Sequence, residues 1–177
     1  MELLEKQLSS KEIFQGRVVH LFLDEIELPN GHKSTREVIR HQGAVCIVPL
    51  LEDGRVLMVR QYRYPFSQVM LELPAGKIDP GETPDVCAVR ELSEETGAVA
   101  ESLLPLGDFY PSVAYTDEVI HLYLAKGLHF GAMHTDEDEF LQLERIPLRE
   151  LINQVMAGEI PDGKTQTALL KAWYLQN

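Results

Sequence analysis

Three glutamates lie close together near the end of the segment from Gly76 to Gly97, GKIDPGETPDVCAVRELSEETG. At about 100° per residue, Glu91, Glu94 and Glu95 share one face of a helix. Carboxylates at this spacing repel one another, and a cation among them relieves the repulsion. Mg²⁺ is a hard ion that prefers carboxylate oxygen, water and phosphate as ligands. The spacing therefore predicts a divalent-metal site on a helix face.

The residues around these glutamates fit the same prediction. Arg90 lies one turn before Glu94 and can hold it by a charge-assisted hydrogen bond. In the preceding loop, Gly76 and Gly81 allow a tight turn or a close approach to a ligand, and Glu82 can reach back to the metal cluster. The alternative for the short pattern RELSEE alone is an ordinary solvated, charged helix.

The full segment resembles the Nudix box, G-x5-E-x7-R-E-U-x-E-E-x-G-U, at every position except the last. There the family has a bulky aliphatic residue and this chain has Ala98. The resemblance implies hydrolysis of a nucleoside diphosphate linked to another group, assisted by divalent cations. It also implies the Nudix α/β/α sandwich, a mixed sheet between helices with an N-terminal antiparallel β extension.

The same resemblance assigns roles to the residues of the box. Glu91 and Glu95 become the main metal ligands, joined by the carbonyl of Ala75. Glu94 becomes a supporting ligand or the partner of the base, and Arg90 orients the carboxylates. Mg²⁺ is the expected ion, with Mn²⁺ as a possible substitute.

Segments outside the box resemble the ADP-ribose pyrophosphatase subfamily. These are Leu71–Ile78 (LELPAGKI) and Arg36–Ile39 (REVI), which precedes a strand that starts with Gly43-Ala44-Val45. In that subfamily the N-terminal strands reach over a partner subunit, which implies a homodimer. Arg36 and Glu37 would then contribute to adenine recognition, and Arg63 would bind the phosphates. An ordinary surface cation is the alternative for each arginine.

A second acidic cluster, Asp136–Glu139, precedes the predicted strand Phe140–Leu143. On its own the cluster is typical of a solvated loop. The subfamily has a late catalytic glutamate in a loop at this position, which implies that Glu137 or Glu139 is the general base or, for Glu139, a further metal ligand. A base on a mobile loop would close over the bound substrate.

One segment departs from the subfamily. Val113-Ala114 stands where ADP-ribose enzymes have Pro-Gly, although the acidic pair that ends with Glu118 is retained, so Glu118 is a candidate substrate contact. The leading prediction is hydrolysis of ADP-ribose to AMP and ribose 5-phosphate. The departure favours the alternative of another nucleoside diphosphate sugar, of the GDP-mannose or ADP-glucose type. A non-catalytic nucleotide sensor is the alternative of another class.

Strands and helices that can position these residues follow from the sequence pattern. Thr83 as N-cap, Pro84 at the first helical position and Gly97 as C-cap predict a helix over 84–96, with Leu92, Ala88 and Val89 beside the glutamates to dock on a sheet. Strands are predicted at 18–28, 34–41, 43–51, 55–62, 70–73, 103–109, 119–125 and 140–146, and two further helices at 148–157 and 165–175. We expect residues 1–42 to form the β extension, involved in dimerisation, and 43–177 to form the hydrolase domain as a single structural unit.

Composition excludes other classes of function. The chain has 177 residues, 45% of them hydrophobic, and a formal net charge of -12. These values predict a folded domain with a core and argue against nucleic-acid binding through a basic surface. No apolar run approaches the roughly 18 residues that a membrane span needs, and the polar N-terminus lacks a signal-peptide pattern, so we expect a cytoplasmic protein without membrane contact. Cys46 and Cys87 lie among apolar residues and are predicted to be buried free thiols.

Overall fold

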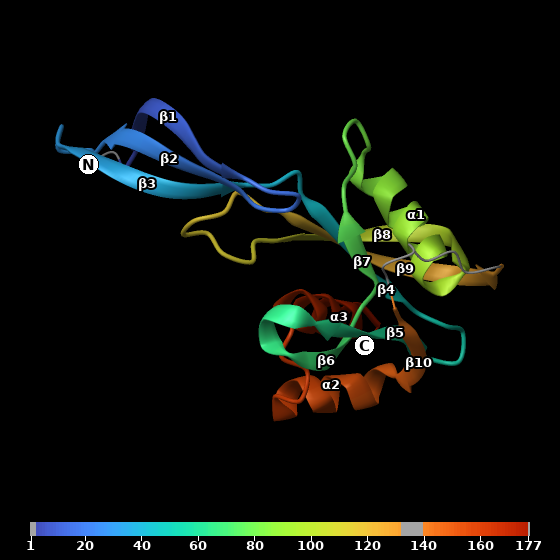
Figure 1. The fold of residues 1–177 in the computed structure, drawn as a ribbon. Coiled ribbons are helices and arrows are strands. Elements are labelled where there is room, and N and C mark those ends of the chain that lie inside the picture. Colours follow the sequence, from blue (N-terminus) through green and yellow to red (C-terminus); the bar gives the residue numbers. More distant parts are fainter. Residues whose placement is uncertain (1–2, 132–139, 177) are drawn as a thin grey trace. The chain divides into compact units, whose positions relative to one another are not determined.

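The computed structural model describes residues 3–131 and 140–176 (Figure 1). The predicted bases Glu137 and Glu139 therefore lie outside the described residues. The described residues form two compact units, and the chain passes between them more than once. The N-terminal unit contains the chain up to Gly43 together with Tyr110–Val119, and the larger unit contains Ala44–Phe109 and the chain from Ile120 onward.

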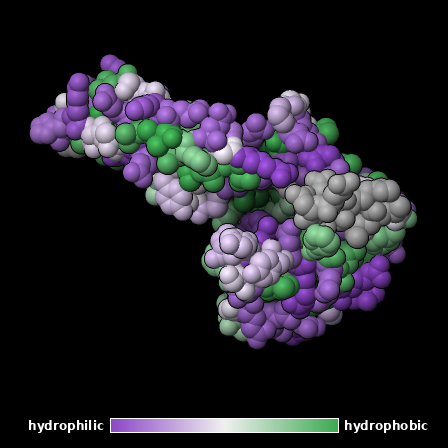
Figure 2. Space-filling view, viewed as in Figure 1, coloured by the Kyte–Doolittle hydropathy of each residue, from purple (hydrophilic) through white to green (hydrophobic). Residues whose placement is uncertain are grey.

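The N-terminal unit is built on an antiparallel sheet with the strand order β1-β2-β3. Its strands are β1 (Lys6–Gln15), β2 (His20–Glu27) and β3 (Lys33–Arg40). The β extension is confirmed, but the sequence pattern did not predict β1, because every side chain of that strand is exposed and no alternation marks it. Figure 2 shows hydrophobic patches (green) among polar residues on this unit, and its exposed apolar side chains include Ile13, Phe14 and Val18.

The segment 110–119 is tied to the end of β3. Ile39 donates its N–H to the Tyr115 carbonyl at 2.7 Å and accepts the N–H of Asp117 at 3.2 Å. The Asp117 carboxylate then accepts the backbone N–H of His41 at 2.7 Å and a guanidinium N–H of Arg40 at 3.2 Å. Two pieces of chain far apart in sequence thus share one hydrogen-bonded junction.

Within the described residues, the larger unit holds two sheets. The first has the order β7-β4-β9-β8 and consists of β4 (Ala44–Pro49), β7 (Ala75–Lys77), β8 (Ala98–Phe109) and β9 (Ile120–Phe130). It is mixed, because β4 and β9 are parallel while its other pairs are antiparallel. The second is antiparallel, with the order β10-β5-β6, and consists of β5 (Arg55–Arg63), β6 (Gln68–Glu72) and β10 (Gln142–Pro147). A short 3-10 helix (Tyr64–Phe66) joins β5 to β6.

Helices cover both faces of the mixed sheet (Figure 1). They are α1 (Pro84–Thr96), α2 (Leu148–Ala157) and α3 (Gly163–Gln176). Side chains of β4 alternate between two cores: Val45 and Ile47 pack in the cluster that contains α1, whereas Cys46 and Val48 pack in the cluster that contains α2 and α3. This arrangement confirms the α/β/α sandwich with a mixed sheet. Cys46 and Cys87 are free and buried, as predicted.

Helix α1 occupies the predicted range from Pro84 to Thr96. Gly97 ends it with a φ of 68°, a left-handed conformation that favours glycine, and donates its N–H to the Ser93 carbonyl. Thr83 stands at the N-cap position with an extended backbone but makes no side-chain cap hydrogen bond, so only its position was predicted correctly. Leu92 is buried against the sheet, whereas Val89 is 47% exposed, which contradicts its predicted docking role.

Ala98 is fully buried in the same core as α1, at the start of β8. The deviation from the box therefore concerns packing behind the helix and not the acidic face. In the described part of the chain, no helix combines the length and apolar character that crossing a membrane requires.

A buried threonine connects α3 to the strand that leads into the box. Thr165 is fully buried, and its hydroxyl accepts the backbone N–H of Leu73 at 3.0 Å. We expect Thr165→Val to lower the free energy of unfolding by about 1–3 kcal/mol, because the Leu73 N–H then stays buried without an acceptor. Urea unfolding of the variant measures this loss.

Thr167→Val is the matched control on the same helix. The Thr167 hydroxyl donates to the Gly163 carbonyl at 2.8 Å, and its loss leaves no buried N–H without an acceptor. An equal loss of stability in both variants would contradict the explanation.

Candidate active site

The box begins where β6 leaves the second sheet and β7 enters the first. Ile47 of β4 donates its N–H to the Pro74 carbonyl at 2.9 Å, and β7 then pairs with β4 in the register Cys46↔Ala75. The loop after β7 turns at Gly81, whose φ is 84°. The backbone N–H of Glu82 donates to the Asp79 carbonyl at 3.0 Å in this turn. Strand β7 and helix α1 are thereby held face to face.

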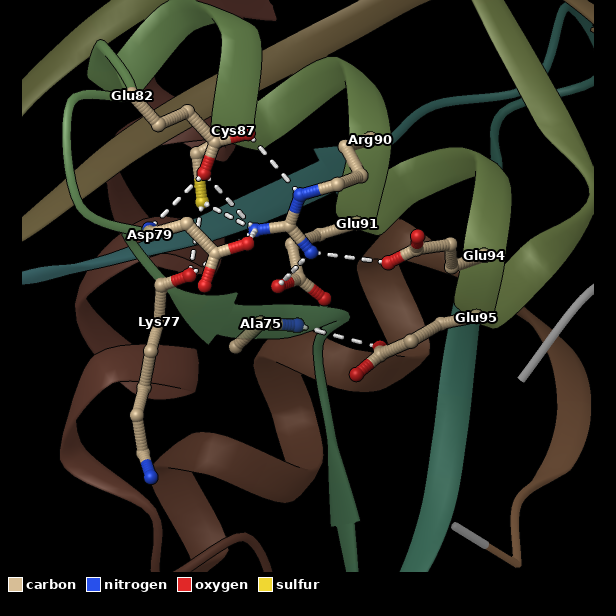
Figure 3. Close-up of polar contacts among 9 residues, drawn as sticks. All are labelled: Ala75, Lys77, Asp79, Glu82, Cys87, Arg90, Glu91, Glu94 and Glu95. Atoms are coloured by element: carbon tan, nitrogen blue, oxygen red, sulfur yellow. Dashed lines mark hydrogen bonds and ion pairs between the residues drawn. The ribbon is translucent and has the colours of Figure 1, made fainter. Parts of the chain in front are cut away.

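Arg90 is the centre of a polar cluster between α1 and this loop (Figure 3). Its guanidinium donates to both carboxylate oxygens of Glu82, at 3.0 and 2.9 Å, and to the Lys77 carbonyl at 3.1 Å. Through Nη1 it donates to Glu91 at 2.7 Å and to Glu94 at 2.9 Å. The predicted bond between Arg90 and Glu94 is confirmed, and Arg90 holds three carboxylates at once.

Mutual hydrogen bonds keep Glu82 and Arg90 charged. The hydrogen bond from Arg90 is the main reason why the pKa of Glu82 falls to about 2, and the N–H of Asp79 adds to the effect. The hydrogen bond to Glu82 in turn raises the pKa of Arg90. Cys87, whose thiol contacts the Lys77 carbonyl at 3.3 Å, is the neutral member, since burial raises its pKa to about 12. Glu82, in the loop, therefore orients the guanidinium of Arg90 through the two hydrogen bonds that it accepts.

Two of the predicted metal ligands are buried against β7. Glu95 is 3% exposed, and its carboxylate accepts the backbone N–H of Ala75 at 3.2 Å. Glu91 is 8% exposed and lies against the backbone of Gly76, where an added methyl group would overlap its carboxylate. Only glycine leaves room for Glu91 in this position. The steric role of Gly76 is specific, and the sequence had suggested only a tight turn or close approach there.

The donor set fits a hard divalent cation. The guanidinium of Arg90 donates to the carboxylates of Glu82, Glu91 and Glu94, while Glu95 on the same helix accepts only the N–H of Ala75 among the bonds drawn in Figure 3. The carboxylates outnumber the cation, and burial of excess negative charge is costly without a compensating cation. Figure 3 shows the Lys77 side chain pointing away from them. In the described part of the chain, no group of three or more His, Cys, Asp and Glu side chains is already arranged to hold a metal ion.

Arg63, the predicted phosphate ligand, lies in the same unit, where its guanidinium pairs with Glu72 through two hydrogen bonds of 2.7 Å. Sequence reasoning missed Glu72 and its second partner, Lys164. The sequence does contain a signal for Glu72, which lies between two leucines in a predicted strand. A carboxylate buried in this way needs a cation or hydrogen-bond donors as partners.

The remaining predicted contacts belong to the N-terminal unit. Arg36 forms an ion pair with Glu5 at 2.5 Å, and Glu37 is exposed on β3. Glu118 lies 3.9 Å from the imidazole of His41, and Val113 is 86% exposed. The substrate roles of these residues stay predictions.

Comparisons with known proteins agree with this geometry. The family model described as NUDIX domain matches residues 40–168, and the model described as nucleoside diphosphate sugar hydrolase N-terminal domain matches residues 5–39. An ADP-ribose pyrophosphatase of Bacillus subtilis is 38% identical over 167 residues, which cover 93% of this chain and 90% of the relative. A methanol dehydrogenase activator of Bacillus methanolicus is 44% identical, with the same coverage of both chains. A crystal structure of an ADP compounds hydrolase superposes with a TM-score of 0.88 at 25% identity, covering 99% of this chain and 96% of that one.

Proposed function

Because this chain belongs to the Nudix hydrolase family, we propose that it cleaves the diphosphate linkage of ADP-ribose to give AMP and ribose 5-phosphate. The observation that carries the proposal is the acidic face of α1, where Glu91, Glu94 and Glu95 meet β7 around Arg90. The choice of ADP-ribose is supported by the similarity to an ADP-ribose pyrophosphatase over almost the whole chain.

Nudix hydrolases generally need divalent metal ions, and we propose Mg²⁺ here, with Mn²⁺ as a substitute. Such an ion, when bound, would neutralise diphosphate charge and make a bound water more acidic. Glu91 and Glu95 would hold it together with the Ala75 carbonyl, and Glu94 would support them. Arg90 keeps the carboxylates of Glu91 and Glu94 in place, which limits the reorganisation that binding requires.

The other roles complete the proposal. Arg63 would bind the diphosphate, and Glu137 or Glu139 would take the proton from the attacking water, with Glu139 also a candidate metal ligand. Arg36 and Glu37 would recognise adenine, and Glu118 would contact the rest of the substrate. We further propose a homodimer, which the exposed apolar side chains of the N-terminal unit support. A cytoplasmic location stays a prediction from the sequence.

A second substrate class is favoured by one observation, the replacement of the Pro-Gly of ADP-ribose enzymes by Val113 and Ala114. The match of residues 5–39 to the model described as the nucleoside diphosphate sugar hydrolase N-terminal domain fits either class. Hydrolysis of GDP-mannose or ADP-glucose is therefore the alternative. A nucleotide sensor without turnover is disfavoured, because the box keeps all three glutamates of the α1 face.

Release of AMP tests the proposal. We expect the purified protein to release AMP from ADP-ribose with Mg²⁺ and to release none with EDTA, because the carboxylate cluster cannot bind a diphosphate without a cation between them. Chromatography of the nucleotide products measures both. Cleavage of GDP-mannose in preference to ADP-ribose would move the proposal to the alternative substrate.

A further inference from the structure

We propose that Lys164 is a positioning residue that acts through Glu72 to hold the guanidinium of Arg63 ready for the substrate diphosphate. The inference rests on the proposed function, because that function supplies the diphosphate for Arg63 to bind. Lys164 is the second residue of α3, far in sequence from the box and from Arg63.

Glu72 is the centre of the arrangement. Its side chain is 2% exposed, and a carboxylate buried to this extent needs cations and hydrogen bonds to remain ionised. Burial raises its pKa, but the hydrogen bonds and charges of Arg63 and Lys164 more than offset this effect and bring the pKa down to about 2. Glu72 is therefore a fixed negative charge shared by two cations.

Arg63 is held by one edge and open at the other. Its Nε and Nη2 atoms each donate to Glu72 at 2.7 Å, and this bidentate contact fixes the plane of the guanidinium. Nη1 makes no hydrogen bond to any residue that the structure describes, and the side chain is 38% exposed. A planar, preorientated guanidinium with one free nitrogen suits recognition of phosphate oxygens.

Lys164 is held more firmly than Arg63. Its side chain is 13% exposed, and its ammonium donates to Glu72 at 2.5 Å and to Asp162 at 2.8 Å. Asp162 also accepts the backbone N–H of Thr165 at 3.1 Å, which caps the start of α3. The rigid end of the helix thus fixes the ammonium, and the ammonium fixes Glu72.

The four charges of this network balance as two ion pairs, and Lys164 supplies half of the positive charge. Without it, the carboxylate of Glu72 would lose one of its two cations and could shift, and the guanidinium that it orients would lose its fixed plane. The expected effect of losing Lys164 is weaker binding of the diphosphate. The alternative is a purely structural role, in which Lys164 only attaches α3 to β6. In that case, losing Lys164 would lower stability without a specific effect on ligand affinity.

A double-mutant cycle separates the two explanations. We expect Lys164→Met to weaken the affinity for ADP, measured by calorimetry with Mg²⁺, by about tenfold, the size of one oriented charge-assisted hydrogen bond. In the Arg63→Ala variant, Lys164→Met should weaken the affinity for ADP less than twofold. With ADP-ribose, KM should rise by a similar factor while kcat changes less than threefold.

Lys171→Met is the matched control, because the ammonium of Lys171 on the same helix donates to the Leu106 carbonyl at 2.7 Å and does not contact Glu72. It should lower Tm without a change in ADP affinity. If Lys164→Met does not fold, Lys164→Arg, which keeps the charge, should retain ADP affinity, and Glu72→Gln should lose it.

Equal effects of Lys164→Met in both backgrounds, or no effect on ADP affinity in the natural protein, would overturn the inference. If Lys164→Arg binds ADP no better than Glu72→Gln, the same conclusion follows. A different result would reject the proposed function alone: the natural protein would bind ADP and show the coupling between Lys164 and Arg63, but it would release no AMP from ADP-ribose.

Discussion

Glu95→Gln is expected to lower kcat for ADP-ribose hydrolysis by about 10³-fold or more, with little change in Tm. The substitution keeps the shape of a side chain that is 3% exposed and keeps an oxygen for the N–H of Ala75. It removes one of the two buried charges that would hold the metal ion. Relief of repulsion on the helix face compensates for part of any lost stability. Steady-state release of AMP and thermal unfolding measure the two quantities.

Glu101→Gln is the control for Glu95→Gln. Glu101 is an exposed glutamate on β8 that pairs with His129 at the surface, so its loss should leave kcat unchanged. Adding Mg²⁺ should raise Tm of the natural protein and of Glu101→Gln, but not of Glu95→Gln, because only a protein that binds the ion is stabilised by it. A loss of activity smaller than tenfold in Glu95→Gln would remove this residue from the metal site.

Gly76→Ala is expected to lower kcat by at least about 10²-fold, the effect of displacing a reacting group by about 1 Å. The new methyl group would overlap the carboxylate of Glu91, which is 8% exposed and has little space in which to retreat. The substitution therefore moves a metal ligand without altering any charge. Overpacking at this site should cost about 1–3 kcal/mol of stability, measurable by urea unfolding.

A second glycine separates the steric effect from simple destabilisation. Gly54 has a φ of 80°, and a methyl group added there would contact nothing within 4 Å. Gly54→Ala should cost about 1 kcal/mol through backbone strain and leave kcat at the natural value. If both variants kept full activity, the close contact between Gly76 and Glu91 would have no functional weight.

Local signals predicted the helix that carries the site. Pro84 favours the start of a helix and Gly97 its end through the conformation of their own backbone, and both ends of α1 agree with the prediction. The exposed strand β1 escaped prediction because periodicity reports only burial on one face, and neither face of β1 is buried. Val89 was placed wrongly because helical geometry gives a direction for a side chain but not the width of the sheet beneath it.

The charge network around Arg63 shows why part of the site could not be predicted. Arg63 and Glu72 are 9 residues apart on neighbouring strands, and Lys164 is 92 residues away from Glu72. Such contacts depend on strand register and on where α3 begins, neither of which a linear pattern contains. The box was predictable because its members lie within a single turn, loop and helix.

The junction between β3 and the segment 110–119 has a consequence for synthesis on the ribosome. Asp117 follows His41 by 76 residues, so at about 5–20 residues per second the end of β3 waits roughly 4–15 s for its partner. During that interval the three-stranded sheet has emerged with an incomplete end. Its outer strand β1 carries Lys6 and Lys11, and such charges discourage pairing between nascent chains. The exposed strand that periodicity failed to detect thus carries charges that disfavour pairing while the rest of the protein is made.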